Sequence, residues 1–295
     1  MGQHIVLMVL MVGIPSHEAQ KRVSEIYQEV ITPASTKLGL VITFYPIHEQ
    51  FYNEFIENVN GLKISYKLSE GAKPGKGFNV TRLINGANQL PIKPDYIVYC
   101  DGSGRIPFKY CLALMENLQK KDISCIFAHR TPWRGGITQE RQVIEEFESN
   151  FVCKHFKIKH TQDFQCGLWS LKYPDCSGMQ INCIGYELEL NVACEALKKS
   201  KKIGILEIPI RVNDTSKSQF KKDDYSINSP HFQKAYFLYK YFNLSKEKLV
   251  ESAVNYNATA PSERRLSEEY LSMLDQIEDG VPKPPNITKL YILCI

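Results

Sequence analysis

The stretch DYIVYCDGSGR, residues 95–105, decides the fold of this chain. Residues 96–100 are apolar, β-branched or aromatic, which is typical of a parallel strand buried on both faces. Asp101 and two nearby glycines end the run. Because ligands in open α/β sheets bind beyond the carboxyl ends of the strands, Asp101 is the first candidate functional residue. The alternative interpretation is an aspartate that closes a turn before the helix near Pro107.

Strand and helix patterns alternate on both sides of this stretch. Apolar runs predict strands over residues 5–12, 40–45, 62–68, 123–128 and 203–212. Apolar periodicity and capping residues predict helices over 19–30, 50–59, 78–89, 107–120, 138–151 and 185–194. This alternation predicts an α/β, Rossmann-like fold with a mostly parallel central sheet flanked by helices. Pro209 favours an edge strand or a bulge in the last of these runs.

Composition narrows the class of protein. The 295 residues carry a net charge of only +4, which argues against a dedicated nucleic-acid binder. The nine cysteines include no CxxC pair, so we expect a reducing compartment, without disulfides or structural zinc. The apolar opening, residues 5–14, is shorter than the roughly 20 residues that a membrane span needs, and it lacks the basic lead of a signal peptide. We therefore predict a cytoplasmic protein, with association at a membrane surface left open.

A second candidate feature is the turn Gly75-Lys76-Gly77 before the predicted helix 78–89. Glycines let backbone N–H groups approach an anion, and a helix N-terminus favours negative charge. Lys76 would add a point charge to a phosphate. The alternative is an ordinary surface turn. No P-loop and no GxGxxG motif follows the first strand, which lowers the ATPase and dehydrogenase interpretations.

The chain divides into residues 1–225, the predicted catalytic domain, and residues 226–295, a mainly helical extension packed on it. Five apolar positions in the extension share one helix face: Phe232, Ala235, Tyr236, Tyr239 and Phe242. Core packing or a homodimer contact is the favoured interpretation of this face, and a lipid- or acceptor-facing surface is the alternative. We expect a linker over 257–263, a helix over 266–277 and an added strand over 290–295 that is too short to anchor the chain in a membrane.

Six short motifs follow one another between Ile5 and Ser218. They are Pro15-Ser16-His17-Glu18, Gly75-Lys76-Gly77, Asp101-Gly102-Ser103, Asp163-Phe164-Gln165-Cys166-Gly167, Glu187-Leu188-Glu189-Leu190, and Lys202-Ile203 with Glu207-Ile208-Pro209-Ile210 and Ser216-Lys217. In this order they resemble the motifs of inverting family 2 glycosyltransferases of the GT-A fold, nearest to the dolichyl-phosphate mannose and glucose synthases. The segment 163–167 is the most specific match.

The resemblance implies transfer of a sugar, with inversion, from a nucleotide-diphosphate donor to an acceptor. It implies that the nucleotide sugar is bound by Pro15, Ser16, Glu18, Lys76, Asp101, Ser103, Arg105, Gln165, Ser216 and Lys217. The candidates for the catalytic base are Asp163 and Glu187, with Glu189 third. On one helix, positions 187 and 189 point about 200° apart, so only one of them can face the cleft. The candidates for stabilising the leaving group are Lys76, Arg105 and Lys217.

Three departures from the family pattern bear on metal and base recognition. The Asp-Asp-Gly-Ser motif after the second strand is replaced by Tyr45-Pro46-Ile47-His48-Glu49. Ser103 stands at the second aspartate of the metal motif, and Arg105 replaces a glutamine. Asp101 alone is a thin ligand set for Mg²⁺ or Mn²⁺, which prefer several oxygen ligands. Arg105 would give the phosphates fixed charge instead, so we predict weak or absent metal dependence.

Two other functions remain open. A non-catalytic nucleotide-sugar-binding protein of the same fold is favoured by the degraded motifs and opposed by the intact segment 163–167. A sugar-phosphate nucleotidyltransferase would need a glycine-rich signature after the first strand, which Gly13-Ile14-Pro15-Ser16 does not supply. Lipid phosphate, glycan, protein and nucleic acid all remain open as acceptors.

Overall fold

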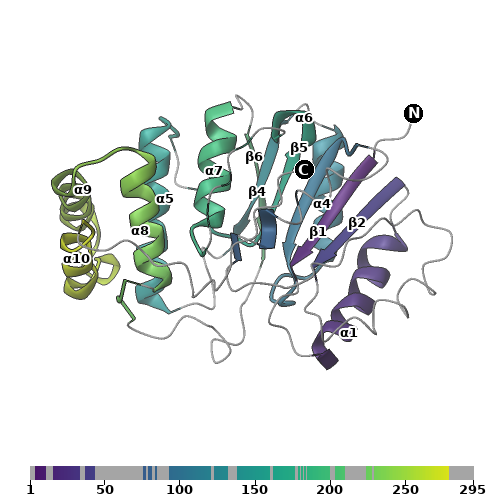
Figure 1. The fold of residues 1–295 in the computed structure, drawn as a ribbon, viewed down its shortest axis with the longest axis horizontal. Helices are drawn as coiled ribbons and strands as arrows, with labels where there is room; N and C mark the ends of the chain where they lie inside the picture. Colours follow the sequence, from purple (N-terminus) through teal and green to yellow (C-terminus); the bar gives the residue numbers. More distant parts are fainter. Residues whose placement is uncertain are drawn as a thin grey trace, which may run out of the picture.

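A twisted sheet with helices on both faces forms the centre of the molecule (Figure 1). The structure is a computed structural model, and it describes residues 4–10, 16–33, 37–43, 76–77, 79–81, 84, 93–120, 123–131, 138–159, 162–176, 179, 181, 183, 185–199, 203–209, 224–227 and 229–278. The predicted helix 50–59 and the predicted strands 62–68 and 290–295 lie outside the described residues.

Six strands make up the sheet, in the spatial order β2-β1-β3-β5-β4-β6. Their bounds are β1 His4–Leu10, β2 Lys37–Thr43, β3 Tyr96–Asp101, β4 Cys125–Arg130, β5 Leu168–Lys172 and β6 Ile203–Ile208. The pairs β1–β2, β1–β3 and β4–β6 are parallel, whereas β5 is antiparallel to both β3 and β4. The prediction of a mostly parallel α/β sheet is therefore confirmed, and the apolar run at 168–170 is its reversed strand.

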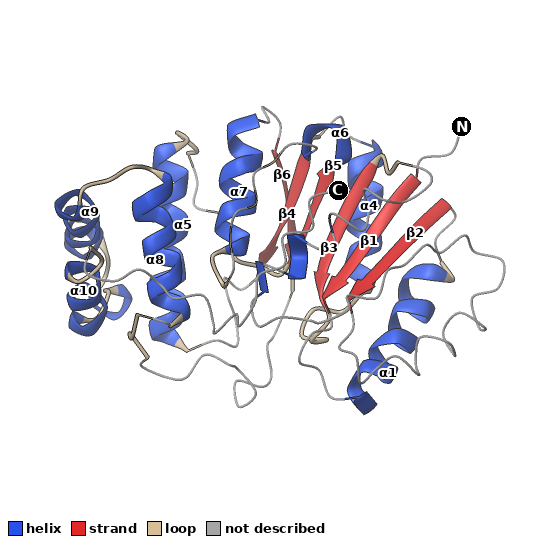
Figure 2. Cartoon of the chain, in the orientation of Figure 1, coloured by secondary structure: helices blue, strands red, loops and turns tan. Residues whose placement is uncertain are grey.

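The helices form two layers and an outer group (Figure 2). Their bounds are α1 Ser16–Ile26, which continues as a π-helical turn over Tyr27–Ile31, α4 Lys109–Lys120, α5 Gln139–His155, α6 Tyr173–Cys176, α7 Leu188–Lys199, α8 Pro230–Tyr241, α9 Lys246–Thr259 and α10 Glu268–Asp275. A 3-10 turn, Ser262–Arg264, joins α9 to α10.

Strand β3 is buried on both faces because its apolar residues alternate between two cores. Tyr96, Val98 and Cys100 pack with α4 and with the helical segment 26–30. Ile97 and Tyr99 pack on the opposite face, in the core that α7 covers. A continuous apolar run is thus divided between two layers, as its composition predicts for a central strand.

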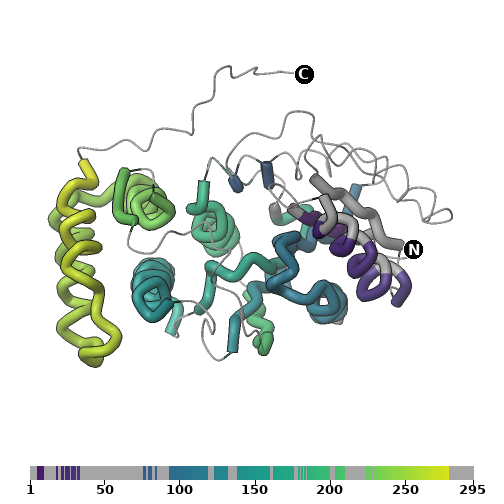
Figure 3. Tube along the Cα trace, turned by 90° about the horizontal axis from the view of Figure 1, so that it is seen from below, coloured from purple at the N-terminus to yellow at the C-terminus, as the bar shows by residue number. Residues whose placement is uncertain are grey.

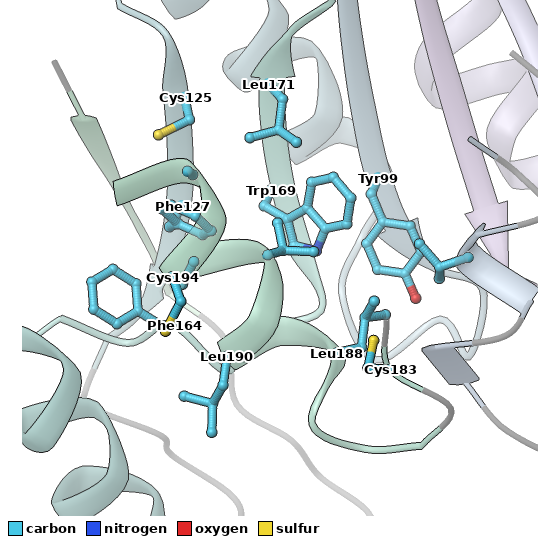
Figure 4. Close-up of a cluster of buried hydrophobic side chains, with 14 of the residues drawn as sticks. Tyr99, Cys125, Phe127, Phe164, Trp169, Leu171, Cys183, Leu188, Leu190 and Cys194 are labelled. Atoms are coloured by element: carbon cyan, nitrogen blue, oxygen red, sulfur yellow. The ribbon is translucent and has the colours of Figure 1, made fainter. Parts of the chain in front are cut away.

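An aromatic pair between adjacent strands stabilises the register of the reversed strand β5. Tyr99 of β3 and Trp169 of β5 are direct partners in the antiparallel register. Their rings stack with centroids 4.7 Å apart and an interplanar angle of 23°. Figure 4 shows the two rings side by side, with Leu188 and Cys183 near the hydroxyl end of Tyr99. Such a pair stabilises the register beyond the area that it buries.

The helical extension packs on the outer face of α5. Phe232 and Ala235 of α8 are buried in a third core with Phe147 of α5, Tyr256 of α9 and Tyr270 of α10. Figures 1 and 3 agree that α8 lies beside α5, with α9 and α10 outside them. The apolar face predicted over 232–242 is therefore packed within the chain at Phe232 and Ala235.

Two predicted boundaries were wrong. The helix predicted over 185–194 begins at Leu188, which leaves Glu187 just before it. The predicted linker 257–263 begins inside α9, which ends at Thr259. There the Asn257 side chain accepts a hydrogen bond from Leu266 N at 2.7 Å and donates one to Leu266 O at 3.1 Å, so this polar residue joins α9 to the segment before α10. Within the described part of the chain, none of the helices has the length and apolar character to cross a membrane.

We predict that the extension unfolds together with the sheet. The Phe147 side chain is 2% exposed and contacts both Tyr256 and Tyr270. Phe147→Ala should lower the free energy of unfolding by about 3–5 kcal/mol, because it removes a ring shared by three helices. Far-UV circular dichroism and tryptophan fluorescence should report one common transition in denaturant. Val254→Ala, at a site that is 52% exposed on α9, is the control and should change stability by about 0.5 kcal/mol or less. An early helical phase without a fluorescence change would contradict the prediction.

Candidate functional site

The carboxyl end of β3 carries a cluster of three charged side chains. Lys76 Nζ lies 3.0 Å from Asp101 Oδ2 and also binds Glu189 Oε1, at the start of α7. Tyr99 donates its hydroxyl hydrogen to Asp101 Oδ1 at 2.5 Å. The side chains of Lys76 and Asp101 are 18% and 29% exposed, so the cluster reaches the surface. Lys76 and the tip of the strand, two features that the sequence predicts separately, therefore meet at one place.

Segment 163–167 forms one wall of this cluster. The backbone N–H of Asp101 donates to Gly167 O at 2.8 Å, which extends the pairing of β3 and β5 by one residue. A Cβ atom at position 167 would lie 2.2 Å from Asp101 Oδ2. A glycine is therefore needed where the carboxylate passes over the neighbouring strand.

The turn 185–187 forms the opposite wall. Gly77 N donates to Gly185 O at 3.2 Å, so the backbone after Lys76 is attached to the segment that leads into α7. Glu187 accepts a hydrogen bond from Gly185 N at 3.2 Å and is partly exposed. Lys76, Asp101 and these two backbone segments together make a polar site at the end of the sheet.

The electrostatics of the cluster favour the charged form of Lys76 and the neutral form of Tyr99. Burial lowers the pKa of Lys76, but the charges of Asp101 and Glu189 outweigh that effect, and the net shift is upward. Burial raises the pKa of Glu189, and the charge of Lys76 opposes this shift. Burial also raises the pKa of Tyr99, with a further contribution from Asp101. Lys76 is thus a permanent cation at the tip of the sheet, where it is paired with two carboxylates.

A second group of charges is buried around Asp163. Arg130 Nε and one of its terminal nitrogens lie 2.6 Å and 2.9 Å from the two oxygens of Asp163, and Arg130 also pairs with Glu145 at 3.2 Å. Asp163 is 1% exposed. Its expected role as the catalytic base does not fit this arrangement, because a buried carboxylate bound on both oxygens by a guanidinium is closed to an acceptor hydroxyl.

Side chains outside the predicted set of site residues also belong to this buried group. Lys234 of α8 is 3% exposed and donates to Gln165 Oε1 at 2.5 Å and to Glu145 Oε1 at 3.3 Å. Gln165 Nε2 donates to Glu148 Oε2 at 2.9 Å. Gln165 is therefore engaged inside the protein rather than at the surface cluster. Lys234, a lysine on an apolar helix face, is the sequence feature that could have indicated this buried group. Its partners Gln165 and Glu145 lie far from it in the sequence.

The remaining predicted residues lie in the loop after β3, on α1, or outside the described residues. Ser103 is exposed and Arg105 partly exposed in the loop after β3, and Glu18 is partly exposed on α1. Ser16 is the first residue of α1. Pro15, Ser216 and Lys217 lie outside the described residues.

The cluster does not offer a ready set of metal ligands. One oxygen of Asp101 accepts from Tyr99 and the other from Lys76, so both face hydrogen-bond donors. In the ranges that the structure describes, no group of three or more His, Cys, Asp or Glu side chains could hold a metal ion. A hard divalent cation in this place would have to displace the Lys76 ammonium. As arranged, these residues do not fit a bound Mg²⁺ or Mn²⁺.

Comparison with known proteins identifies the fold. No family model and no curated protein matches the sequence. Among solved structures, glucosyl-3-phosphoglycerate synthase of M. tuberculosis is similar over 83% of this chain and 82% of that chain, with a TM-score of 0.57 and 11% identity. The same enzyme in complex with Mn²⁺, uridine diphosphate and phosphoglyceric acid gives a TM-score of 0.58, 12% identity and coverage of 83% of this chain and 80% of that chain. The chain therefore has the GT-A-like fold of glycosyltransferases, as its motifs predict.

His231 of α8 is a buried histidine beside the Asp163 group and is 6% exposed. Burial lowers the pKa of His231 from its ordinary value of 6.5 to about 3. The charges of Lys234 and Arg141 add to this decrease, and those of Glu145 and Glu140 oppose it. The imidazole is therefore neutral in the folded protein near neutral pH.

We predict that His231 makes the folded protein less stable as the pH is lowered. The unfolded chain binds a proton at His231 below about pH 6.5, whereas the folded chain does so only near pH 3, so stability falls as the pH is lowered through this window. The slope from this one group is about 1.4 kcal/mol per pH unit at most. Denaturant unfolding at several pH values should give a flatter slope for His231→Gln than for the wild-type protein. Equal slopes between pH 6.5 and 4 would contradict the prediction.

Proposed function

We propose that this chain is a glycosyltransferase that moves a sugar from a nucleoside-diphosphate donor to an acceptor. The observation that carries the proposal is the contact of Lys76 with Asp101 at the carboxyl end of β3. The GT-A-like fold supports it, because ligands of open α/β sheets bind at this end of the strands. The exposed part of the cluster then receives the diphosphate.

The chemistry follows from where negative charge develops. The acceptor oxygen attacks the anomeric carbon, the bond from that carbon to the diphosphate oxygen breaks, and the diphosphate leaves with the electron pair. A base takes the proton of the acceptor hydroxyl. A single displacement of this kind inverts the anomeric centre. The fixed cation Lys76 stabilises the departing diphosphate, and its ion pairs hold it in place beforehand.

Among the three candidate bases, the geometry favours Glu187. Glu189 is 5% exposed and bound to Lys76, and Asp163 is 1% exposed and bound to Arg130. Glu187, at the turn that borders the cluster, is partly exposed as a residue, although its Oε2 atom is buried and its Oε1 accepts from Gly185 N. We assign Glu187 the role of base, Glu189 the role of holding Lys76, and Asp163 the role of positioning segment 163–167.

We further propose that transfer does not depend strongly on a divalent metal. The related M. tuberculosis structure is of a complex with Mn²⁺ and uridine diphosphate. In this chain Ser103 removes one carboxylate, and the oxygens of Asp101 accept from Lys76 and Tyr99. A lysine ammonium therefore supplies the charge at the diphosphate, and Arg105, in the adjoining loop, is a second cation for the donor.

One alternative has an observation in its favour. Two of the three candidate bases are buried in ion pairs, which suits a protein that binds a nucleotide sugar without turning it over.

We propose residues 1–225 as the donor-binding domain and 226–295 as an extension packed on it. The acceptor, a homodimer and association with a membrane surface remain predictions from the sequence.

The first test is donor binding by thermal shift with UDP-, GDP- and CDP-sugars, followed by turnover with the donor that stabilises the protein. Lys76→Met should weaken binding of that donor by about 10- to 100-fold, because it removes a charge-assisted contact with the phosphates. Lys109→Met, at an exposed lysine of α4, is the control and should bind normally. A donor-induced rise in the unfolding temperature without turnover would favour the non-catalytic binding protein. Equal donor binding by the wild-type protein and Lys76→Met would reject the proposed donor site at Lys76.

Metal dependence is tested with the same donor in excess EDTA. We expect donor binding and turnover to persist, because Lys76 already neutralises Asp101. Complete loss in EDTA, restored by Mn²⁺ or Mg²⁺, would show that a metal displaces Lys76 and would reject the proposal. Titrating Mn²⁺ against the Asp101→Asn variant would then identify whether Asp101 is the ligand.

A further inference from the structure

Two consecutive residues of α8 reach the two walls of the candidate site. Gln233 Oε1 accepts a hydrogen bond from Tyr186 N at 3.1 Å, on the wall 185–187. Lys234 Nζ donates to Gln165 Oε1 at 2.5 Å, on the wall 163–167. Side chains of consecutive helical residues diverge by about 100°, so a single rigid turn of helix can contact both segments.

The contact through Gln233 leads to Lys76. A Cβ atom at position 185 would lie only 1.9 Å from Gln233 Oε1, so the helix side chain presses directly on the backbone of Gly185. The carbonyl of Gly185 accepts the hydrogen bond from Gly77 N. Two steps therefore connect Gln233 to the residue that follows Lys76.

The contact through Lys234 leads to Asp101. Gln165 is held by Lys234 at its oxygen and by Glu148 and the Glu145 carbonyl at its nitrogen. Two residues later, Gly167 O accepts the hydrogen bond from Asp101 N. Lys234 thus fixes the segment that carries the backbone partner of Asp101.

The burial of Lys234 makes this attachment strong. Lys234 is 3% exposed, and its ammonium faces Gln165, Glu145 and Glu148. Moving α8 away would take this ammonium from two buried carboxylates and from Gln165, which is unfavourable. The helix is therefore held in a fixed position relative to both walls.

We propose that α8 is a positioning element of the site, in which Gln233 and Lys234 set the placement of Lys76 relative to Asp101. The extension that begins at residue 226 then completes the donor site instead of merely packing behind it. This inference rests on the proposed function for its effect on the donor, but the structural link can be measured without any ligand.

The ligand-free test is amide hydrogen exchange in Gln233→Ala. We expect exchange at Tyr186 and Gly77 to quicken by about 3- to 10-fold, since one neutral hydrogen bond is lost. The matched control is Tyr241→Phe, which removes another α8 contact, the 2.9 Å hydrogen bond from Tyr241 to Glu195 of α7. Unchanged exchange at Gly77 in Gln233→Ala, or an equal change in Tyr241→Phe, would overturn the proposal.

The second test uses the donor found by thermal shift. Gln233→Ala should lower kcat/KM by about 3- to 10-fold, whereas Tyr241→Phe should lower the unfolding midpoint without changing kcat/KM. Lys234→Met should have the larger effect on kcat/KM; if it fails to fold, Gln233→Ala still decides. Equal kcat/KM in Gln233→Ala and wild-type protein would overturn the proposal. If no donor binds the wild-type protein, the proposed function fails, and hydrogen exchange alone still tests the link to α8.

Discussion

The ammonium of Lys76 holds two carboxylates together at the end of the central strand. Asp101 and Glu189 come from β3 and α7, and without a cation between them their charges would repel. Glu189 is almost fully buried, so an unpaired charge there would be costly. The ion pairs therefore join three segments of the chain that are far apart in sequence. The polar end of the sheet depends on this one side chain.

The second cluster of charges performs a different task. Arg130, Asp163 and Glu145 lie in the interior, and Lys234 adds a further cation from the helical extension. Buried ion pairs contribute little to stability compared with apolar packing, but breaking one partner is strongly unfavourable. They hold the segment 163–167 through Asp163, bound by Arg130, and Gln165, bound by Lys234. These buried charges position a wall of the surface site, and they are themselves shielded from any ligand that binds there.

The sheet and the surface cluster could be predicted because each relies on local signals. The apolar run 96–100 identified the central strand, and the glycine-lysine turn identified the cation that meets Asp101. The burial of Asp163 could not be foreseen, because its partner Arg130 is set by the pairing of distant strands. The reversed strand β5 pairs Trp169 with Tyr99, two residues far apart in sequence, and no local pattern encodes this contact. The predicted linker 257–263 overlaps the end of α9, where the Asn257 amide bonds the backbone of Leu266, a contact that no local pattern indicates.

The position of β5 constrains how the nascent chain can be folded during synthesis. Strand β4 precedes β5 in sequence, yet β5 lies between β3 and β4 in the sheet. Until residues 168–172 leave the ribosome, β3 has no neighbour on one side, and its backbone and the Tyr99 ring present an open apolar edge. Such edges pair readily with other chains, so this interval is the stage at which aggregation competes with folding. Chaperone capture would be most valuable between the emergence of β3 and that of β5.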